Sequence, residues 1–486
     1  MKILFVSSEV YPFAKTGGLA DVAYALPKML RKSDSNYRDE EVSQEPVDAR
    51  IILPKYGSIS ENFTSKLIHI ANFGVPVGWR NQYCGLQFLN YKSIPVYFID
   101  NEYYFKRESF YGDFDDGERF SFFCRAVLES IKYMDGFMPD VIHCNDWQTG
   151  MIPLLLKVHY SHCYWNVKTV YTIHNLKYQG VYSPEILTEL LCLDMSYYDE
   201  GKCKYHDGIS FMKSGINYCD AITTVSPSYA EEVQTPYYGE GLNGLLCEKR
   251  EKLQGIVNGI DYDEFNPSRD ENIFEKYSLK NYKLKINNKL ELQREFAMPV
   301  DLDTPMISIV SRLVKQKGLD LMTCIIDELL EMDIQMVILG SGDIEYTDFF
   351  EYYSKSYPSK LHVYWGYSDQ LARKIYAASD MFLMPSQFEP CGIGQLISMR
   401  YGTVPIVRET GGLKDTVIPY NAYTNEGIGF SFANFNAHEM LDTIRTAAEV
   451  YKDKKAWSGL VRRAMKTDFS WKQSALKYID LYNYLL

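Results

Sequence analysis

The chain has 486 residues, of which 46% are hydrophobic and 23% charged, and its formal net charge is −12. That length suits two or more domains, and the composition excludes a disordered or collagen-like chain. The acidic balance excludes a general affinity for nucleic acid or anionic membranes, although it is compatible with a local basic pocket for an anionic small molecule.

Targeting signals and metal or disulfide frameworks are not expected. No apolar run reaches the roughly 20 residues of a membrane helix, and the first residues lack a signal or transit pattern. The ten cysteines include no CxxC pair, a usage that favours reduced, buried thiols over disulfides or a zinc site. We therefore expect a cytoplasmic protein and discount the glycosylation sequon at Asn62.

The first half of the chain alternates apolar runs with amphipathic stretches. Strands are predicted for KILFVSS, RIILP, IPVYFID, DVIHCND, KTVYTIH and AITTVS. Helices are predicted after the first strand, with a local kink at Pro27, and around residues 119–134 and 151–160. Strands that alternate with helices predict a doubly wound, mostly parallel sheet.

The same plan restarts near residue 306. A strand, a basic loop and an amphipathic helix are predicted over residues 306–332, followed by the strands QMVILGSG, LHVYWGY, DMFLMPS and TVPIVRETGG. A polar stretch at about 262–300 is predicted to be a connection beside a hinge, with some helix. We expect a first domain at 1–257, completed by a C-terminal helix at 470–486, and a second at 258–469.

The C-terminal helix is predicted from its apolar spacing. It places on one side Lys472, Leu476, Ile479 and Tyr482, with Ala475 beside them. By fold analogy the helix crosses back onto the first domain. The alternative is a surface for a partner protein.

Basic loops follow the first strand of each half. Lys15, Gly17 and Gly18 precede a helix whose free N–H groups favour an anion. Arg312 and Lys317 suit a diphosphate, since arginine makes a forked contact and lysine a point charge. Each loop could instead be an ordinary surface turn. Because ligands bind at the carboxyl ends of such strands, the pattern predicts two Rossmann-like domains facing a central cleft.

Other polar residues also follow predicted strands. Glu389 suits sugar or ribose hydroxyls, but it could equally cap the next helix. The glycine pair at 411–412 repeats the turn-to-helix pattern and could be a turn alone. His174 with Asn175, and Asp146, end strands of the first half, where such residues are often only satisfied structural groups.

Several other chemistries are disfavoured. Asp113 and Asp115 form a D-x-D pattern but lack a flanking apolar strand, so we do not expect a metal there. The histidines 143, 159 and 162 lack zinc-ligand spacing. The chain has neither a G-x-S-x-G elbow nor a P-loop.

Taken together, the motifs resemble the bacterial glycogen synthase and plant starch synthase family of retaining α-glucan glucosyltransferases. KTGGLADV, HNLKYQG, GIVNGID, SRLVKQKGLDL and EPCGIGQL with YGTVPIVRETGGLKDTV occur in the family's order and spacing over residues 15–417. The resemblance implies the GT-B fold and glucose transfer from ADP-glucose to the 4-hydroxyl of the non-reducing end of an α-1,4-glucan, glycogen or starch. It implies no cofactor or metal and no nucleic-acid or membrane partner, and it leaves a homo-oligomer open.

The resemblance also implies residue roles. Lys15 and Gly18 approach the donor's phosphates or sugar, and Arg312 and Lys317 hold the diphosphate. Glu389 binds glucose hydroxyls, while His174 lies beside the transferring glucose and Asp146 shapes the acceptor side; Tyr367 stacks on the base. The implied catalytic residues are His174, Arg312, Lys317 and Glu389, and the implied substrate-binding residues are Lys15, Gly18, Asp21, Asp146, Asn175, Asn258, Tyr367, Cys391 and Gly392.

Two departures from the wider fold bear on specificity. Ile397 stands where many relatives carry a second glutamate, which matches the starch-synthase branch and disfavours sucrose- or lipid-directed enzymes. The run CGIGQ lacks the bulkier polar residue common before the glutamine. Alternatives are a related transferase with another acceptor, the same synthase using UDP-glucose, and a catalytically silent glucan- or nucleotide-binding protein. A phosphorylase would need a pyridoxal-binding lysine in a much longer chain.

The expected chemistry needs no pair of catalytic carboxylates. A diphosphate is already a good leaving group when cations stabilise its charge, unlike the glycosidic oxygen that a glycosidase must protonate. The acceptor hydroxyl then attacks from the same face, and the departing phosphate helps to take its proton. In this mechanism Glu389 positions the donor and is not a nucleophile.

Overall fold

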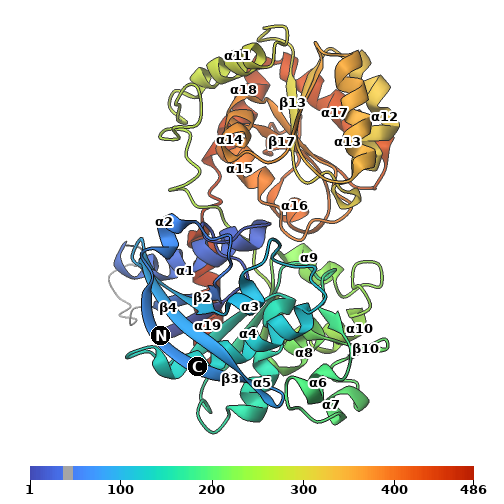
Figure 1. Cartoon of the computed structure of the whole chain (residues 1–486). Coiled ribbons are helices and arrows are strands. Elements are labelled where there is room, and N and C mark those ends of the chain that lie inside the picture. Colours follow the sequence, from blue (N-terminus) through green and yellow to red (C-terminus); the bar gives the residue numbers. More distant parts are fainter. Residues whose placement is uncertain (37–46) are drawn as a thin grey trace. The chain divides into compact units, whose positions relative to one another are not determined.

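The computed structural model describes residues 1–36 and 47–486, and the chain divides into two compact units (Figure 1). Unit 1 comprises Met1–Val225, Ala230–Asn258 and Trp471–Leu486. Unit 2 comprises Ser226–Tyr229 and Gly259–Ser470. Among the described residues, no helix is both long enough and apolar enough to cross a membrane.

Unit 1 is built on a nine-stranded sheet. Its strands are β1 (Lys2–Val6), β2 (Asp48–Pro54), β3 (Ile68–Val77), β4 (Arg80–Tyr91), β5 (Ile94–Asp100), β6 (Val141–Asn145), β7 (Lys168–Ile173), β11 (Ala221–Thr224) and β12 (Leu253–Gly255). They lie in the order β12–β11–β7–β6–β1–β2–β5–β4–β3, parallel except for the antiparallel pairs β3–β4 and β4–β5. A small second sheet contains β8 (Val181–Tyr182), β9 (Lys204–Tyr205) and β10 (Gly208–Ser210).

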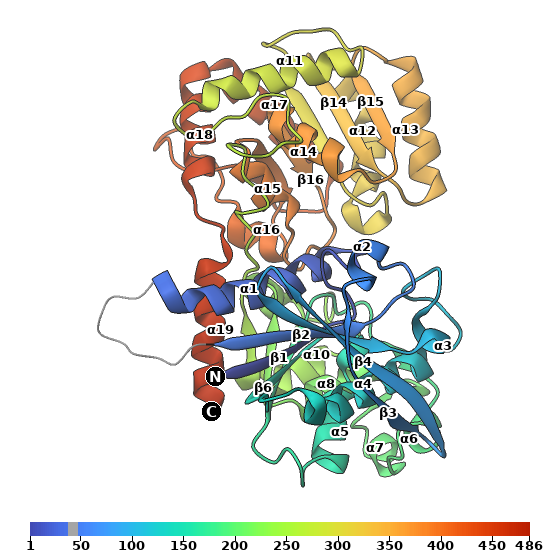
Figure 2. The same ribbon diagram turned by 60° about the vertical axis from the view of Figure 1, so that its left-hand side comes forward.

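Helices cover this sheet and carry its loops. They are α1 (Gly18–Asn36), α2 (Glu61–Thr64), α3 (Glu102–Phe105), α4 (Asp116–Ser130), α5 (Ile152–His159), α6 (Ile186–Glu189), α7 (Ser196–Asp199), α8 (Phe211–Tyr218), the end of α9 (Pro227–Glu232, whose first residues belong to unit 2), α10 (Asn243–Glu248) and α19 (Trp471–Leu485). The first and last of these, α1 and α19, pack together (Figure 2). All six strands predicted in this half are confirmed; the β3–β4 hairpin was not predicted.

Unit 2 has a six-stranded, wholly parallel sheet. Its strands are β13 (Met306–Val310), β14 (Gln335–Gly340), β15 (Leu361–Trp365), β16 (Met381–Met384), β17 (Val404–Arg408) and β18 (Phe430–Phe432), in the order β15–β14–β13–β16–β17–β18. The helices are α11 (Lys285–Glu295), α12 (Leu319–Glu331), α13 (Ile344–Ser356), α14 (Asp369–Ala378), α15 (Gly394–Arg400), α16 (Gly411–Thr416), α17 (Ala437–Lys452) and α18 (Lys454–Lys466). The five strands predicted here are confirmed.

Two predicted helix features can be compared with the structure. The helix α1 is continuous through Pro27, so a local kink there stays a prediction. In α19 the buried face consists of Trp471, Ser474, Ala475, Tyr478, Ile479 and Tyr482, whereas Lys472 and Leu476 are only half-buried. The prediction was therefore right for Ala475, Ile479 and Tyr482 and wrong for Lys472 and Leu476, because it gave no weight to Trp471 and Tyr478.

The polar stretch at 262–300 is more than a connection. Its helix α11 packs on α14, and two of its lysines are buried. Lys289 Nζ lies 2.8 Å from Asp380, and Lys285 Nζ donates to the carbonyl of Ala377 at 2.7 Å. Burial lowers the pKa of Lys285 to about 7. An apolar pattern could not reveal this part of the core, because all but one of the buried residues of α11 are charged or carry an amide.

The cysteines are all free thiols, but four of them are exposed. Cys163, which was expected to be buried, is exposed, as are Cys192, Cys247 and Cys324. Cys144 and Cys219 are buried as expected.

Candidate active site

The order of strands marks one place in each unit where ligands bind. In unit 1, the strands that follow β1 in the chain, up to β5, lie on one side of the neighbours β1 and β6, and the strands that follow β6 lie on the other side. In unit 2, the strands that follow β13, up to β15, and those that follow β16 lie on opposite sides of the neighbours β13 and β16 in the same way. Loops leaving such a pair diverge at the carboxyl edge, which is where open parallel sheets bind their ligands. The predicted site residues of each unit follow the carboxyl ends of its strands.

In unit 2, an ion pair joins the loops after β13 and β16. Lys317 Nζ donates to Glu389 Oε2 at 2.6 Å, and Ser386 Oγ donates to the same oxygen at 2.9 Å. Glu389 is 7% exposed. Within the described part of the chain its other oxygen, Oε1, accepts no hydrogen bond, so it can receive one from a ligand hydroxyl. The alternative of a helix cap is wrong, because α15 begins only at Gly394.

Glycines bring the backbone close together around this pair. Gly318 has φ +73°, and a Cβ there would lie 1.9 Å from the carbonyl oxygen of Pro385. At the start of α16, a Cβ on Gly411 would lie 2.2 Å from the carbonyl oxygen of Glu389, and one on Gly412 2.2 Å from that of Cys391. The predicted turn glycines therefore permit close contact between these loops, and a turn is not their whole purpose.

The backbone after Glu389 is held by one glutamine. Gln395 Nε2 donates to the carbonyls of Cys391 and Gly392, each at 3.0 Å. Gly392 has φ +73°, in the left-handed region that favours glycine. Cys391 is buried. The structure thus gives Cys391 and Gly392 a defined place beside Glu389 through their backbone.

Arg312 and Tyr367 lie at the same edge without joining the ion pair. Arg312, after β13, is exposed and forms no ion pair with any described residue. Tyr367, after β15, is also exposed, and its hydroxyl lies 3.3 Å from Asp369 Oδ1. A free guanidinium and an accessible aromatic ring are available for a phosphate and a base.

In unit 1, the loop between β1 and α1 is organised by a residue that the sequence analysis missed. Glu9 is buried, and its carboxylate accepts hydrogen bonds from the Thr16 backbone, from Thr16 Oγ1 at 2.6 Å and from the Gly17 backbone at 3.2 Å. Lys15 Nζ donates to Asp21 Oδ1 at 2.8 Å. Residues 15–18 are exposed, and a Cβ on Gly17 would meet no atom within 4 Å. The loop is thus rigidly anchored yet open.

The ends of β6 and β7 are joined through Asp146. Asp146 Oδ1 accepts the backbone N–H of His174 at 2.7 Å, and the Asn175 N–H lies 3.4 Å away. Burial, with Glu9 nearby as a like charge, raises the pKa of Asp146 to about 7. Its backbone has φ +54° and ψ −176°, a conformation that is costly for any residue but glycine.

His174 is neutral and has a defined tautomer. Burial lowers its pKa to about 3. Its Nε2 lies 2.9 Å from Asn145 Oδ1, while Asn145 Nδ2 donates to the Val6 carbonyl at 2.9 Å. The amide oxygen is therefore the acceptor, His174 carries its proton on Nε2, and Nδ1 is left to accept a hydrogen bond from a ligand.

Asn258, at the end of unit 1's second segment, is also buried. Its Oδ1 has no hydrogen-bond partner among the described residues. An unsatisfied buried oxygen costs about 1–3 kcal/mol, so a ligand donor at this position would be favourable.

Comparison with known proteins identifies the family. The family of starch synthase catalytic domains matches residues 2–248, and that of group 1 glycosyl transferases matches residues 293–460. A glycogen synthase of Clostridium acetobutylicum is 56% identical over 99% of both chains, and one of Caldicellulosiruptor saccharolyticus is 54% identical over 100% of both. The chain belongs to the glycogen synthase and starch synthase family.

Structural comparison agrees with this family. The catalytic domain of starch synthase IV from Arabidopsis thaliana, solved with ADP and acarbose, superposes with a TM-score of 0.90 at 33% identity over 99% of both chains. Sucrose-phosphate synthase from Thermosynechococcus elongatus, at 15% identity and a TM-score of 0.62 over 100% of this chain and 98% of that one, shares the fold alone. The fold is GT-B, and the activity of the family is that of a retaining glucosyltransferase.

The D-x-D pattern has a structural explanation in this family member. Asp113 Oδ2 lies 2.8 Å from Arg119 Nη1, and both oxygens of Asp115 accept from Arg107, at 2.9 and 2.7 Å. Arginines thus balance both carboxylates. His143 is also internal, bonded to Tyr482 and Thr172 at 2.6 Å each.

Proposed function

We propose that this chain transfers glucose from ADP-glucose to the 4-hydroxyl at the non-reducing end of an α-1,4-glucan, with retention of configuration. The observation that carries the proposal is 56% identity to a glycogen synthase over 99% of both chains. The ADP in the starch synthase IV structure supports an adenine nucleotide as the donor's leaving group. The ten free cysteines fit a cytoplasmic enzyme.

Unit 2 holds the donor in this proposal. Arg312 and Lys317 bind the diphosphate and stabilise its charge as the bond to glucose C1 breaks. The free Oε1 of Glu389 accepts a glucose hydroxyl, and Tyr367 stacks on the base. Cys391 and Gly392, which follow Glu389 in the chain, offer backbone groups to the sugar.

Unit 1 contributes to the sugar and the acceptor. Lys15 and Gly18 approach the donor from the loop that Glu9 anchors, and Asp21 orients Lys15 at 2.8 Å. His174 accepts a glucose hydroxyl at Nδ1, Asn258 receives a donor hydrogen bond, and Asp146 with Asn175 shapes the acceptor side. The acceptor oxygen bonds to C1 on the face that the diphosphate leaves, and its proton passes to the departing phosphate.

Nucleotide release tests the proposal. Purified protein is given ADP-glucose or UDP-glucose, with and without glycogen. Glycogen-dependent ADP release, with labelled glucose entering the polymer, is the expected result. UDP release instead would change the donor, and release that ignores glucan would overturn the acceptor.

A further inference from the structure

An irregular loop of unit 2 carries Glu389 from the end of β16 to the start of α15. It covers residues 385–393 and contains neither helix nor strand, so its backbone carbonyls need donors from other parts of the chain. The neighbouring strand β17 runs parallel to β16, with Val407 opposite Met384. The register therefore places Arg408, the last residue of β17, beside the first residues of this loop.

Arg408 donates hydrogen bonds to the backbone of the loop. Its Nη1 lies 2.5 Å from the carbonyl oxygen of Gln387 and 3.4 Å from that of Ser386. Its guanidinium carbon lies 5.7 Å from the centre of the Phe435 ring, a cation–π contact that stabilises the side chain. Ser386 in turn donates its hydroxyl to Glu389 Oε2 at 2.9 Å. Arg408 thus contacts the backbone of a residue that itself orients the carboxylate.

A second side chain contacts the next peptide of the loop. Gln316, in the loop after β13, has its Nε2 3.3 Å from the Phe388 carbonyl oxygen, and its own carbonyl accepts the Gln387 N–H at 2.9 Å. The two residues before Glu389 are therefore each fixed through their carbonyl by a side chain. Of these two donors Arg408 is the charged one, and hydrogen bonds from a charged donor are the stronger.

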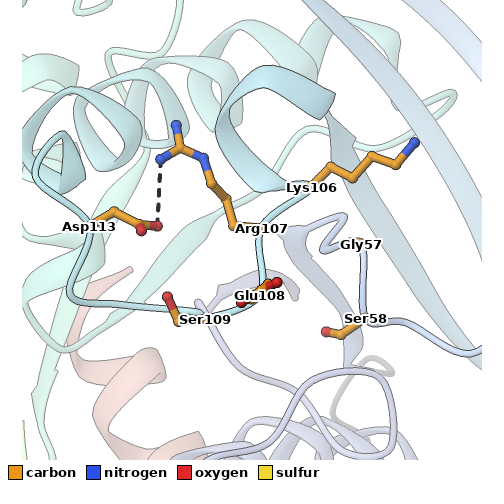
Figure 3. A pocket seen from close by; sticks show the side chains of 7 residues that line it. All are labelled: Gly57, Ser58, Lys106, Arg107, Glu108, Ser109 and Asp113. Carbon is orange, nitrogen blue, oxygen red and sulfur yellow. Dashed lines mark ion pairs between the residues drawn. The ribbon is translucent and has the colours of Figure 1, made fainter.

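This use of an arginine differs from that at the polar pocket of unit 1. There, Arg107 Nη1 lies 3.6 Å from Asp113 Oδ2 (Figure 3), and the same guanidinium makes a forked contact with Asp115. Carboxylates balance the charge of Arg107, whereas the loop offers Arg408 uncharged carbonyls. A positive charge beside the donor site could act in two ways, by fixing the loop or by attracting the diphosphate, and these two roles predict different results.

We propose that Arg408 is a positioning residue for Glu389, which it keeps in place to bind the hydroxyls of the donor's glucose. The inference rests on the proposed function, in which Glu389 contacts that sugar. Without Arg408, the carbonyls of Ser386 and Gln387 lose their donor, and the Ser386 hydroxyl no longer has a fixed place beside Glu389 Oε2. Lys317 still lies 2.6 Å from that oxygen, so the carboxylate keeps its counter-charge and loses its orientation.

Three variants test this role, with Arg463→Met as the matched control for Arg408→Met. Arg463, in α18, also donates to a backbone carbonyl, that of Gly427 at 2.7 Å, and lies 5.8 Å from the Tyr420 ring centre. No predicted site residue lies on the loop that it contacts. The third variant, Arg408→Lys, keeps the charge and one donor but cannot reproduce the geometry of the guanidinium.

Calorimetric titration with ADP-glucose and with ADP isolates the contribution of the sugar. Arg408→Met is expected to raise the Kd for ADP-glucose about 5–10-fold and to leave the Kd for ADP unchanged. Arg408→Lys should show the same difference between the two ligands at smaller size, and Arg463→Met should change neither Kd. If Arg408→Met does not fold, Arg408→Lys carries the test. An equal rise of both Kd values would make Arg408 a diphosphate ligand and overturn the inference.

A double-mutant cycle shows whether the effect passes through Glu389. Alone, Arg408→Met should lower kcat/KM for ADP-glucose about 5–10-fold, but in a Glu389→Gln background it should lower it less than about twofold further. Losses that multiply in full would overturn the inference, as would an unchanged Kd for ADP-glucose in folded Arg408→Met.

These outcomes are distinguishable from failure of the proposed function. A wild-type protein that binds ADP-glucose but transfers glucose to no glucan contradicts the proposed function, and the two titrations still decide whether Arg408 supports the sugar contact. If UDP-glucose is the donor, UDP-glucose and UDP take the place of the adenine pair in the same titrations.

Discussion

At the scale of the residue, Lys317 combines two roles, and replacing it by alanine removes both. It is bonded to Glu389 at 2.6 Å and is proposed to hold a phosphate. A charge-assisted hydrogen bond contributes about 1.5–3 kcal/mol. We therefore expect Lys317→Ala to lower kcat/KM for ADP-glucose about 10–150-fold. Lys315→Ala is the control, because Lys315 lies on the same loop but is directed to Asp320 at 3.9 Å. An equal fall of kcat/KM in both variants would mean that the overall charge of the loop, and not the contact made by Lys317, causes the effect.

The raised pKa of Asp146 predicts how kcat/KM depends on pH. His174, with a pKa near 3, is neutral above pH 5, whereas Asp146, with a pKa near 7, titrates in the working range. Protonation weakens its hold on the His174 N–H, so kcat/KM should fall as the pH drops through about 7. Asp146→Asn should lower the rate and remove this dependence. A limb near pH 7 that survives in Asp146→Asn would exclude Asp146 as its source.

The same group has the opposite effect on stability. Its pKa is raised on folding from 3.8 to about 7, so the folded state binds more protons between these values and its stability falls as the pH rises through that window. At pH 8, Asp146→Asn should therefore raise the melting temperature while it lowers activity. A lower melting temperature would mean that the charged carboxylate is stabilising.

At the scale of the element, the start of α16 lies against the backbone that follows Glu389. A Cβ on Gly412 would lie 2.2 Å from the Cys391 carbonyl oxygen and 2.5 Å from its Cα. Because both are backbone atoms, the loop must move. We expect Gly412→Ala to raise the KM for ADP-glucose severalfold and to lower the melting temperature.

The matched control is Gly244→Ala in α10. A Cβ there meets no atom within 4 Å, and alanine is the better helix former. This variant should melt at or above the wild-type temperature. If Gly412→Ala behaved in the same way, the close approach of α16 would have no functional weight.

At the scale of the whole molecule, the parallel strands were predictable and the links between them were not. Central strands such as β6 and β7 are buried along almost their whole length, because parallel sheets are covered on both faces, and β-branched and other apolar residues mark them in the sequence. The hairpin strand β3 mixes exposed residues with Gly74 and Pro76, so it lacks a clear period. Glu9 belongs to no local pattern; its role depends on residues 16 and 17 meeting it in space.

In the candidate site, too, the positions of residues along the chain were predictable and their contacts were not. Motif order was enough to place Lys317 and Glu389 each after a strand of the second half, but only the observed strand order shows that these strands, β13 and β16, are neighbours at the switch point. It could not show that Asn145 sets the tautomer of His174, or that Ser386 shares the oxygen to which Lys317 donates. Asn145 and Ser386 are ordinary polar residues in the sequence, and only their short distances to His174 and Glu389 in the structure show their roles.

The last helix completes the unit that the first strand begins, which gives the final prediction. The helix α19 buries Trp471, Tyr478, Ile479 and Tyr482, and Tyr482 bonds to His143 of β6 at 2.6 Å. At about 1.5–3 kcal/mol for each side chain, losing the four exceeds about 6 kcal/mol, a large part of a typical folding free energy. Removing residues 471–486 should therefore unfold unit 1, seen as rapid amide exchange in its strands, while unit 2 keeps its protection.

Tyr482→Phe is the milder companion to that truncation. It keeps the apolar packing but leaves the buried His143 Nδ1 without its partner, which should cost about 1–3 kcal/mol in urea unfolding. Burial also holds the pKa of His143 near 3, below the 6.5 of an unfolded histidine, so stability from this residue is complete above pH 6.5 and is lost as the pH falls. The truncation and the point variant should thus differ in size but affect the same unit. Protected strands in a truncated unit 1 would show that its sheet folds before the chain is complete.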